Sequence, residues 1–188
     1  MIKLLPNILS LFRIASVPFI LLFLYAGETY YFYAFVLFLM AAISDWLDGL
    51  IARHWDGLTD FGSWIDPVAD KCLVLGVLIA LSVLTDSNFL MGCNVLLIMR
   101  NVVMSMIRER CRRSQMASAV KVSSLGKTKT IFEFIYISFS LFYLAYSYYA
   151  VEEVLMLLGL LAVGFSYLSL CLYIKNLSDS LTIRYSKG

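Results

Sequence analysis

The segment from residue 45 to residue 70 reads DWLDGLIARHWDGLTDFGSWIDPVAD. It holds six of the thirteen acidic residues, in a protein of 188 residues that is 61% apolar and only 15% charged. On a helix, Asp45, Asp48, Gly49, Ala52 and Arg53 share one face, because they stand at i, i+3, i+4, i+7 and i+8. The spacing therefore predicts a stripe of two carboxylates, two small residues that leave room for a bulky group, and a guanidinium that can pair with a phosphate oxygen.

A second pair of acids follows at the start of the next apolar stretch. Asp66 and Asp70 are four residues apart, and Gly62 lies four residues before Asp66. Four carboxylates that converge at a membrane surface repel one another unless cations neutralise them. Oxygen ligands without His or Cys suit Mg²⁺, Mn²⁺ or Ca²⁺, and two such ions about 4 Å apart can clamp both oxygens of a phosphoryl displacement. The simpler interpretation, solvated helix ends, is kept for Asp56 and Asp60, which lie off the stripe.

Apolar stretches make up most of the remaining chain, whose mean hydropathy is +0.84. A helix needs about 20 residues to cross a bilayer core, so a chain of this length has room for six spans and for no separate soluble domain. We expect an all-α polytopic membrane protein in which residues 1–188 form one domain, with six transmembrane helices and a polar cavity open to the cytoplasmic side. The longest charge-free cores of the six stretches are residues 14–27, 29–44, 72–85, 87–99, 134–151 and 154–174.

The basic residues indicate the orientation. If the N-terminus is cytoplasmic, all 15 Lys and Arg residues fall on the cytoplasmic side, where such residues are retained. The opposite turns, near Glu28, Asp86 and Glu152, hold only acids. We therefore expect both termini and the acidic segment to be cytoplasmic, with membrane lipids and no nucleic acid as partners.

The acidic segment resembles the signature of the CDP-alcohol phosphotransferase family, which is DxxDGxxAR, eight residues, then GxxxDxxxD. The eight specified positions are all filled, by Asp45, Asp48, Gly49, Ala52, Arg53, Gly62, Asp66 and Asp70. The resemblance implies an enzyme that transfers a substituted phosphate from a CDP-linked lipid to an alcohol, releases CMP, and uses two divalent cations, Mg²⁺ or Mn²⁺.

The same resemblance implies a role for each matching position. Asp45, Asp48 and Asp66 are expected to be metal ligands, and Asp70 is expected to be both a ligand and the general base that takes the alcohol proton. The residues expected to border the CDP-lipid are Gly49, Ala52, Arg53, Gly62 and, from the matching opening segment, Asn7.

Beyond the signature, residues 5–135 are similar to the phosphatidylglycerophosphate synthase branch of the family, starting with PNILSLFRIASVPF. The acceptor in that branch is glycerol 3-phosphate, whose phosphate needs fixed positive charge. Arg100 and Arg108 are eight residues apart at the expected cytoplasmic end of the fourth span, on nearly one helix face. Lys127 and Lys129 cannot both face the site on a regular helix, and Lys127 is preferred. The chain departs from the branch at Asn101, where Glu is expected, and at Glu133, where Gln is more frequent.

Two alternatives stay open at this point. The first is another member of the family that uses a different acceptor, such as inositol phosphate, and the second is a divalent-cation carrier that uses the aspartates as its transport site. A carrier is expected to hold its ligands near the bilayer midplane, whereas the acidic segment is expected near one face. Similarity to the family further suggests CDP-diacylglycerol as the lipid substrate, a homodimer, and a bacterial cytoplasmic membrane as the location.

Overall fold

The computed structural model describes the backbone of residues 5–54, 60–113, 124–146 and 152–185, and the side chains of residues 8–45, 68–111, 128–146 and 152–179. Within these ranges the protein consists of six long α-helices and one short 3₁₀ turn, with no strand, which confirms the all-α expectation. In chain order the elements are α1 (Leu5–Ala26), η2 (Glu28–Tyr30), α2 (Tyr31–His54), α3 (Asp60–Leu84), α4 (Asn88–Arg113), α5 (Ser124–Tyr146) and α6 (Glu152–Tyr185).

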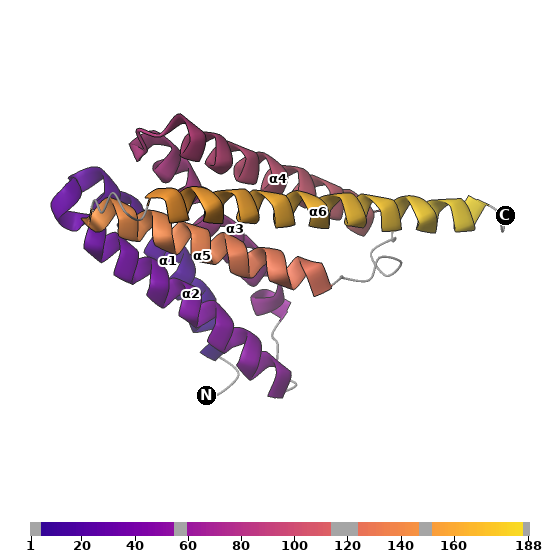
Figure 1. The fold of residues 1–188 in the computed structure, drawn as a ribbon. Helices are drawn as coiled ribbons and strands as arrows, with labels where there is room; N and C mark the ends of the chain where they lie inside the picture. Colours follow the sequence, from indigo (N-terminus) through magenta and orange to yellow (C-terminus); the bar gives the residue numbers. More distant parts are fainter. Residues whose placement is uncertain (1–4, 55–59, 114–123, 147–151, 186–188) are drawn as a thin grey trace.

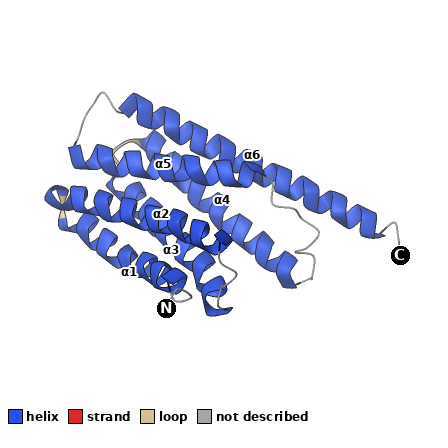
Figure 2. Cartoon of the chain, turned by 90° about the horizontal axis from the view of Figure 1, so that it is seen from below, coloured by secondary structure: helices blue, strands red, loops and turns tan. Residues whose placement is uncertain are grey.

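The helices form a closed bundle rather than a flat layer. Helix α1 packs against α2 and α3. Helix α3 packs against α4, α4 against α6, α6 against α5, and α5 against α2, which closes the ring. Figures 1 and 2 show the bundle from two sides, with the last part of α6 extending beyond its neighbours. Residues distant in sequence therefore face a common interior, and α6 takes part in enclosing it.

The reversal between α1 and α2 takes place at Gly27. Its φ of 109° lies in a region that residues with a side chain rarely adopt. The amide of Tyr30 donates to the carbonyl of Gly27 at 2.9 Å and closes the 3₁₀ turn. The rings of Phe23, Tyr30 and Tyr33 cluster beside it, with Phe23 stacked on Tyr30 at 6.3 Å between centroids. Aromatic rings of this kind are typical of a membrane interface.

Three helices are long and apolar enough to cross a membrane, judged over the described residues: Ile8–Ala26, Asn88–Cys111 and Glu152–Asp179. Large apolar side chains are also exposed on the outer faces of the other helices, including Met40 on α2, Val83 on α3 and Ile131 on α5. A surface of this kind suits a lipid environment better than water. Since lipid is as apolar as these side chains, cohesion must come from close packing and buried polar contacts.

Close packing is most evident at two glycines. A Cβ placed on Gly76 of α3 would lie 3.1 Å from Val17 of α1. A Cβ placed on Gly159 of α6 would lie 3.2 Å from the sulfur of Cys93 on α4 and 3.2 Å from the ring of Tyr136 on α5. The absence of a side chain therefore lets α6 approach both of its neighbours.

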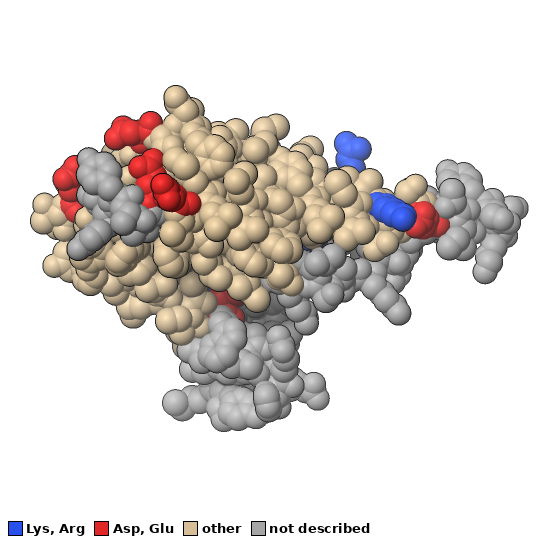
Figure 3. Space-filling model, viewed as in Figure 1, with Lys and Arg blue, Asp and Glu red and all other residues tan. Residues whose placement is uncertain are grey.

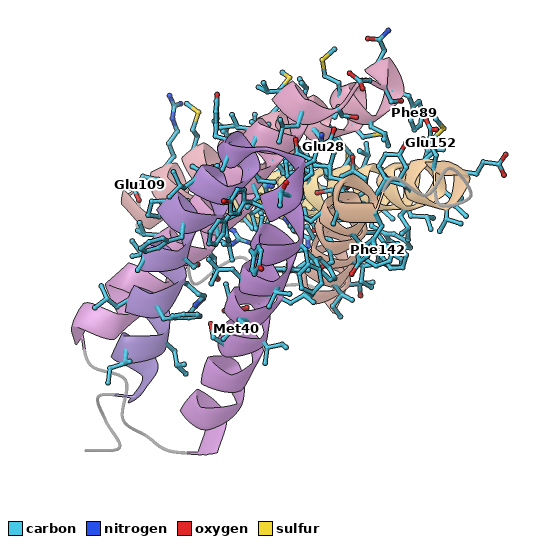
Figure 4. All side chains as sticks on the ribbon, turned by 90° about the vertical axis from the view of Figure 1, so that its left-hand side faces the viewer. Glu28, Met40, Phe89, Glu109, Phe142 and Glu152 are labelled. Carbon is cyan, nitrogen blue, oxygen red and sulfur yellow. The ribbon has the colours of Figure 1, made fainter. Side chains whose placement is uncertain are left out.

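Charge is distributed unevenly along the bundle. At the end where α4 and α6 begin, the turns present acids: Glu28, Asp86, Glu152 and Glu153. Figure 3 shows acidic side chains gathered at this end and basic side chains in the opposite half, and Figure 4 views the bundle from the acidic end, with Glu28, Phe89 and Glu152 labelled. The expected charge asymmetry is thus present in the described residues.

Candidate active site

A cavity of about 270 Å³ opens among α3, α4, α5 and α6. Its wall contains two acids and four basic residues, an excess of two positive charges, together with neutral polar and apolar groups. The charged residues are Asp70, Lys71, Arg100, Arg108, Lys129 and Glu133. A site with this balance can accept an anionic molecule and still offers a carboxylate to it.

The carboxylates of Asp45 and Asp70 meet at one side chain of α1. The Nη1 atom of Arg13 lies 2.6 Å from Oδ1 of Asp45 on α2, and the same nitrogen is hydrogen-bonded to Oδ1 of Asp70 on α3. Arg13 is 1% exposed, whereas the two acids are 35% and 44% exposed. The two aspartates predicted to act together are therefore brought together, with a buried guanidinium between them.

The cavity brings the predicted base and three of the four predicted cations to one place. Asp70 on α3, Arg100 and Arg108 on α4, and Lys129 on α5 all line it. Eight residues of α-helix separate the two arginines, which keeps them on one face, as the sequence predicted. The side chain of Lys129, the less favoured of the two lysines, lies in the cavity wall, and the side chain of Lys127 lies outside the described residues.

Arg100 lies near the middle of α4, which continues to Arg113. A charge at this depth is stable because it is partnered inside the bundle. Arg100 is 4% exposed; its Nε donates to the backbone carbonyl of Ser166 on α6 at 3.0 Å, and its Nη1 donates to Oδ1 of Asn101 at 3.3 Å.

A polar network connects α4 and α5 in the wall of the cavity. Lys129 donates to Oε2 of Glu133 at 2.7 Å and to Oδ1 of Asn101 at 3.0 Å. The amide nitrogen of Asn101 donates to the other carboxylate oxygen of Glu133. The two positions that depart from the resembled branch, Asn101 and Glu133, are therefore in direct contact.

Other predicted site residues have their backbone in the described helices, but their side chains lie outside the described residues. They are Asn7 in α1; Asp48, Gly49, Ala52 and Arg53 in α2; Gly62 and Asp66 in α3; and Lys127 in α5. Helix α2 runs unbroken to His54, so the signature positions from Asp45 onward keep the helical register predicted for them. Among the side chains that are described, no three acids, histidines or cysteines form a group that could hold a metal ion.

Sequence reasoning missed two contributions to this site. The sequence does not place Arg13 beside the aspartates, although an arginine in an apolar segment requires a partner, and that requirement was the available signal. The backbone of α6 was missed because the resemblance ended at residue 135, and a carbonyl acceptor such as that of Ser166 leaves no trace in side-chain identity.

Comparisons with known proteins identify the family of the chain. A family model described as CDP-alcohol phosphatidyltransferase matches residues 3–166. The chain is 37% identical over 126 residues to a CDP-diacylglycerol–glycerol-3-phosphate 3-phosphatidyltransferase of Escherichia coli, a match that covers 66% of this chain and 69% of that relative. Relatives of the same name from Shigella flexneri and Shigella sonnei match with the same identity and coverage. With its signature complete and the family model matched from the first helix into the sixth, the chain belongs to the CDP-alcohol phosphatidyltransferase family.

Proposed function

We propose that this protein transfers the phosphatidyl group of CDP-diacylglycerol to glycerol 3-phosphate, releasing CMP and forming phosphatidylglycerophosphate for phospholipid biosynthesis. The relatives that match it carry the name of this activity. The observation that supports it most directly is the cavity in which Asp70 stands beside Arg100, Arg108 and Lys129. A carboxylate next to several cations suits an alcohol substrate that carries a phosphate group. The carboxylate can take the hydroxyl proton while the cations bind the phosphate.

We propose further that all six long helices cross the membrane and that the chain acts as one integral-membrane catalytic domain. Helices α2, α3 and α5 have between 23 and 25 residues, enough to span a hydrocarbon core about 30 Å thick. The uneven charge distribution supports an orientation with both termini and the cavity opening on the cytoplasmic side of a bacterial cytoplasmic membrane. We include homodimer formation on the family resemblance alone.

The two carboxylates that meet at Arg13 are suitable ligands for divalent cations. Oδ1 of Asp45 and Oδ1 of Asp70 lie within hydrogen-bond distance of the same nitrogen, so carboxylates from two helices converge on one point. Hard oxygen donors of this kind favour Mg²⁺ or Mn²⁺. We propose that Asp45, Asp48, Asp66 and Asp70 hold two such ions, which would neutralise charge on the CDP diphosphate when bound.

The roles of the side chains follow from their positions. Arg100 and Arg108 bind the phosphate of glycerol 3-phosphate, whose two negative charges match the excess of two positive charges in the wall. Asp70 accepts the hydroxyl proton as the alcohol oxygen forms a bond to the phosphorus that carries diacylglycerol, and the bond from that phosphorus to the CMP oxygen breaks. Arg13 is hydrogen-bonded to Asp70 and holds its carboxyl group in place beside the cavity.

An acceptor panel tests the proposal. Purified protein is incubated with CDP-diacylglycerol and Mg²⁺ or Mn²⁺, with each candidate acceptor in turn, and released CMP and lipid product are measured. We expect CMP release with glycerol 3-phosphate and none after chelation of the metal. Turnover with inositol phosphate alone would instead favour the other acceptor, which shares the phosphate group. Metal flux in proteoliposomes without any CDP-lipid turnover would favour the carrier.

A further inference from the structure

Two members of the network formed by Asn101, Lys129 and Glu133 are buried. Glu133 is 2% exposed and Lys129 is 9% exposed. Both oxygens of Glu133 accept hydrogen bonds, one from Lys129 and one from Asn101. A buried carboxylate with this environment is strongly held, because removing Lys129 would leave an uncompensated charge, and removing Asn101 an unpaired oxygen, in a medium that solvates them poorly.

The amide of Asn101 has only one favourable orientation in this environment. Its oxygen accepts from two cations, Lys129 at 3.0 Å and Arg100 at 3.3 Å. Its nitrogen can only donate, and it faces the carboxylate of Glu133, which can only accept. Turning the amide over would place its NH₂ group against two cationic donors and its oxygen against a carboxylate. Glu133 therefore fixes the direction in which Asn101 presents its oxygen.

The fixed orientation of Asn101 also affects the cavity wall. The guanidinium of Arg100 is held on one side by the carbonyl of Ser166 and on the other by the oxygen of Asn101. If Asn101 turned, Arg100 would lose one of these two contacts and gain rotational freedom. Lys129, which also lines the cavity, is tied directly to Glu133. The two cations on this side of the cavity thus depend on a single carboxylate.

We infer that Glu133 is a positioning residue that sets the affinity of the cavity for its anionic acceptor, acting through Asn101 on Arg100 and directly on Lys129. This inference rests on the proposed function, since it assigns the acceptor phosphate to this wall. It gives a role to the two positions at which the chain departs from the resembled branch. Glu133 lines the same cavity, but the role inferred for it is to hold Asn101 and Lys129 and not to bind the phosphate.

The contact between Asn101 and Glu133 allows an isosteric exchange. Glu133→Gln keeps the shape of the side chain but replaces one acceptor with a donor, so an NH₂ group must face either Lys129 or the donor of Asn101. Asn101→Asp alone would place two carboxylates against each other. In the double variant Asn101→Asp/Glu133→Gln the carboxylate lies on α4, where it can accept from Arg100, from Lys129 and from the amide introduced on α5. Charge and hydrogen bonds are then conserved with the direction of one bond reversed.

The test measures the KM for glycerol 3-phosphate and for CDP-diacylglycerol in the full-length protein and in these variants. We expect each single variant to raise the KM for glycerol 3-phosphate about tenfold, the loss typical of a hydrogen bond to a charged group, and to leave the KM for the lipid within about twofold. The double variant should return the KM for glycerol 3-phosphate to within about threefold of wild type, since coupling within one network is not additive. Glu153→Gln, an exposed acid at the far end of α6, is the matched control and should change neither KM.

The outcomes separate this inference from the proposed function. Wild-type protein that turns over CDP-diacylglycerol only with another acceptor would overturn the proposed function. Active wild-type protein together with an unchanged or lower KM for glycerol 3-phosphate in Glu133→Gln would overturn the inference alone. An equal rise in both KM values would also overturn it, since a merely structural role predicts that result. If the single variants fail to fold, the double variant decides, and its failure to fold or to bind glycerol 3-phosphate would contradict the inference.

Discussion

Arg13 and Asp45 form an ion pair between the first two long helices, with 2.6 Å between Nη1 of the arginine and Oδ1 of the aspartate. The same nitrogen also binds Asp70, so one buried side chain of α1 holds together acids from α2 and α3. A cation at this position relieves the repulsion between the two carboxylates.

Arg13→Gln should therefore destabilise the protein most when divalent metal is removed. Loss of a charged hydrogen-bond donor costs about 1.5–3 kcal/mol, and we expect the lower part of this range because both acids are partly exposed. Added Mn²⁺ should reduce the loss, because a ligand that binds the folded state stabilises it. The Tm of wild type and variant, each with EDTA and with Mn²⁺, checks this. Lys175→Gln, an exposed cation on α6, serves as control, and equal Tm losses in both conditions would contradict the prediction.

Asp70→Asn should abolish turnover while CDP-diacylglycerol still binds. The amide has nearly the same shape as the carboxylate but cannot accept the hydroxyl proton, and a general base contributes about 10²–10⁴-fold to rate. CMP release and CDP-lipid binding should be measured in parallel. Asp86→Asn changes an exposed acid at the opposite end of the bundle and should keep full activity. Asp70→Asn with near-normal kcat would remove the residue from its proposed role.

Arg108→Ala should weaken the binding of glycerol 3-phosphate more than the binding of CDP-diacylglycerol. Arg108 lines the cavity with Arg100 and Lys129, so its loss removes one of the charges available to the acceptor phosphate. We expect the KM for glycerol 3-phosphate to rise about tenfold, as for one charge-assisted hydrogen bond. Steady-state kinetics with each substrate varied in turn provide the measurement, with Lys175→Ala as the control. The same increase for both substrates would show that the residue does not belong to an acceptor pocket.

Gly159→Leu should lower the thermal stability of the bundle. A side chain at this position would collide with Cys93 and Tyr136, and Tyr136 cannot move freely because its hydroxyl donates to Asn94 at 2.7 Å. Overpacking of this kind costs about 1–3 kcal/mol. The Tm should fall, and Gly164→Leu, at a position with no atom within 4 Å of the added Cβ, should leave it nearly unchanged. Equal effects of the two substitutions would mean that α6 does not pack as closely as described.

Local features of the chain were readable from the sequence. Each charge-free core coincides with an observed helix over most of its length, because apolar segments of this length bury their backbone groups best as helices. The spacing of Asp45 to Arg53 predicted a shared helix face, since positions within one helix are related by a constant rotation. The position of Arg100 and Arg108 on one helix face could be predicted for the same reason.

Contacts between helices could not be read in this way. Arg13 meets Asp70 across 57 positions of sequence, Asn101 meets Glu133 across 32, and Arg100 meets the carbonyl of Ser166 across 66. Each depends on how far one helix is rotated and shifted against another, which close packing around residues such as Gly159 decides. The sequence by itself determined the helices and the type of chemistry, while the tertiary structure decided which charges neutralise one another and which remain to bind a phosphate.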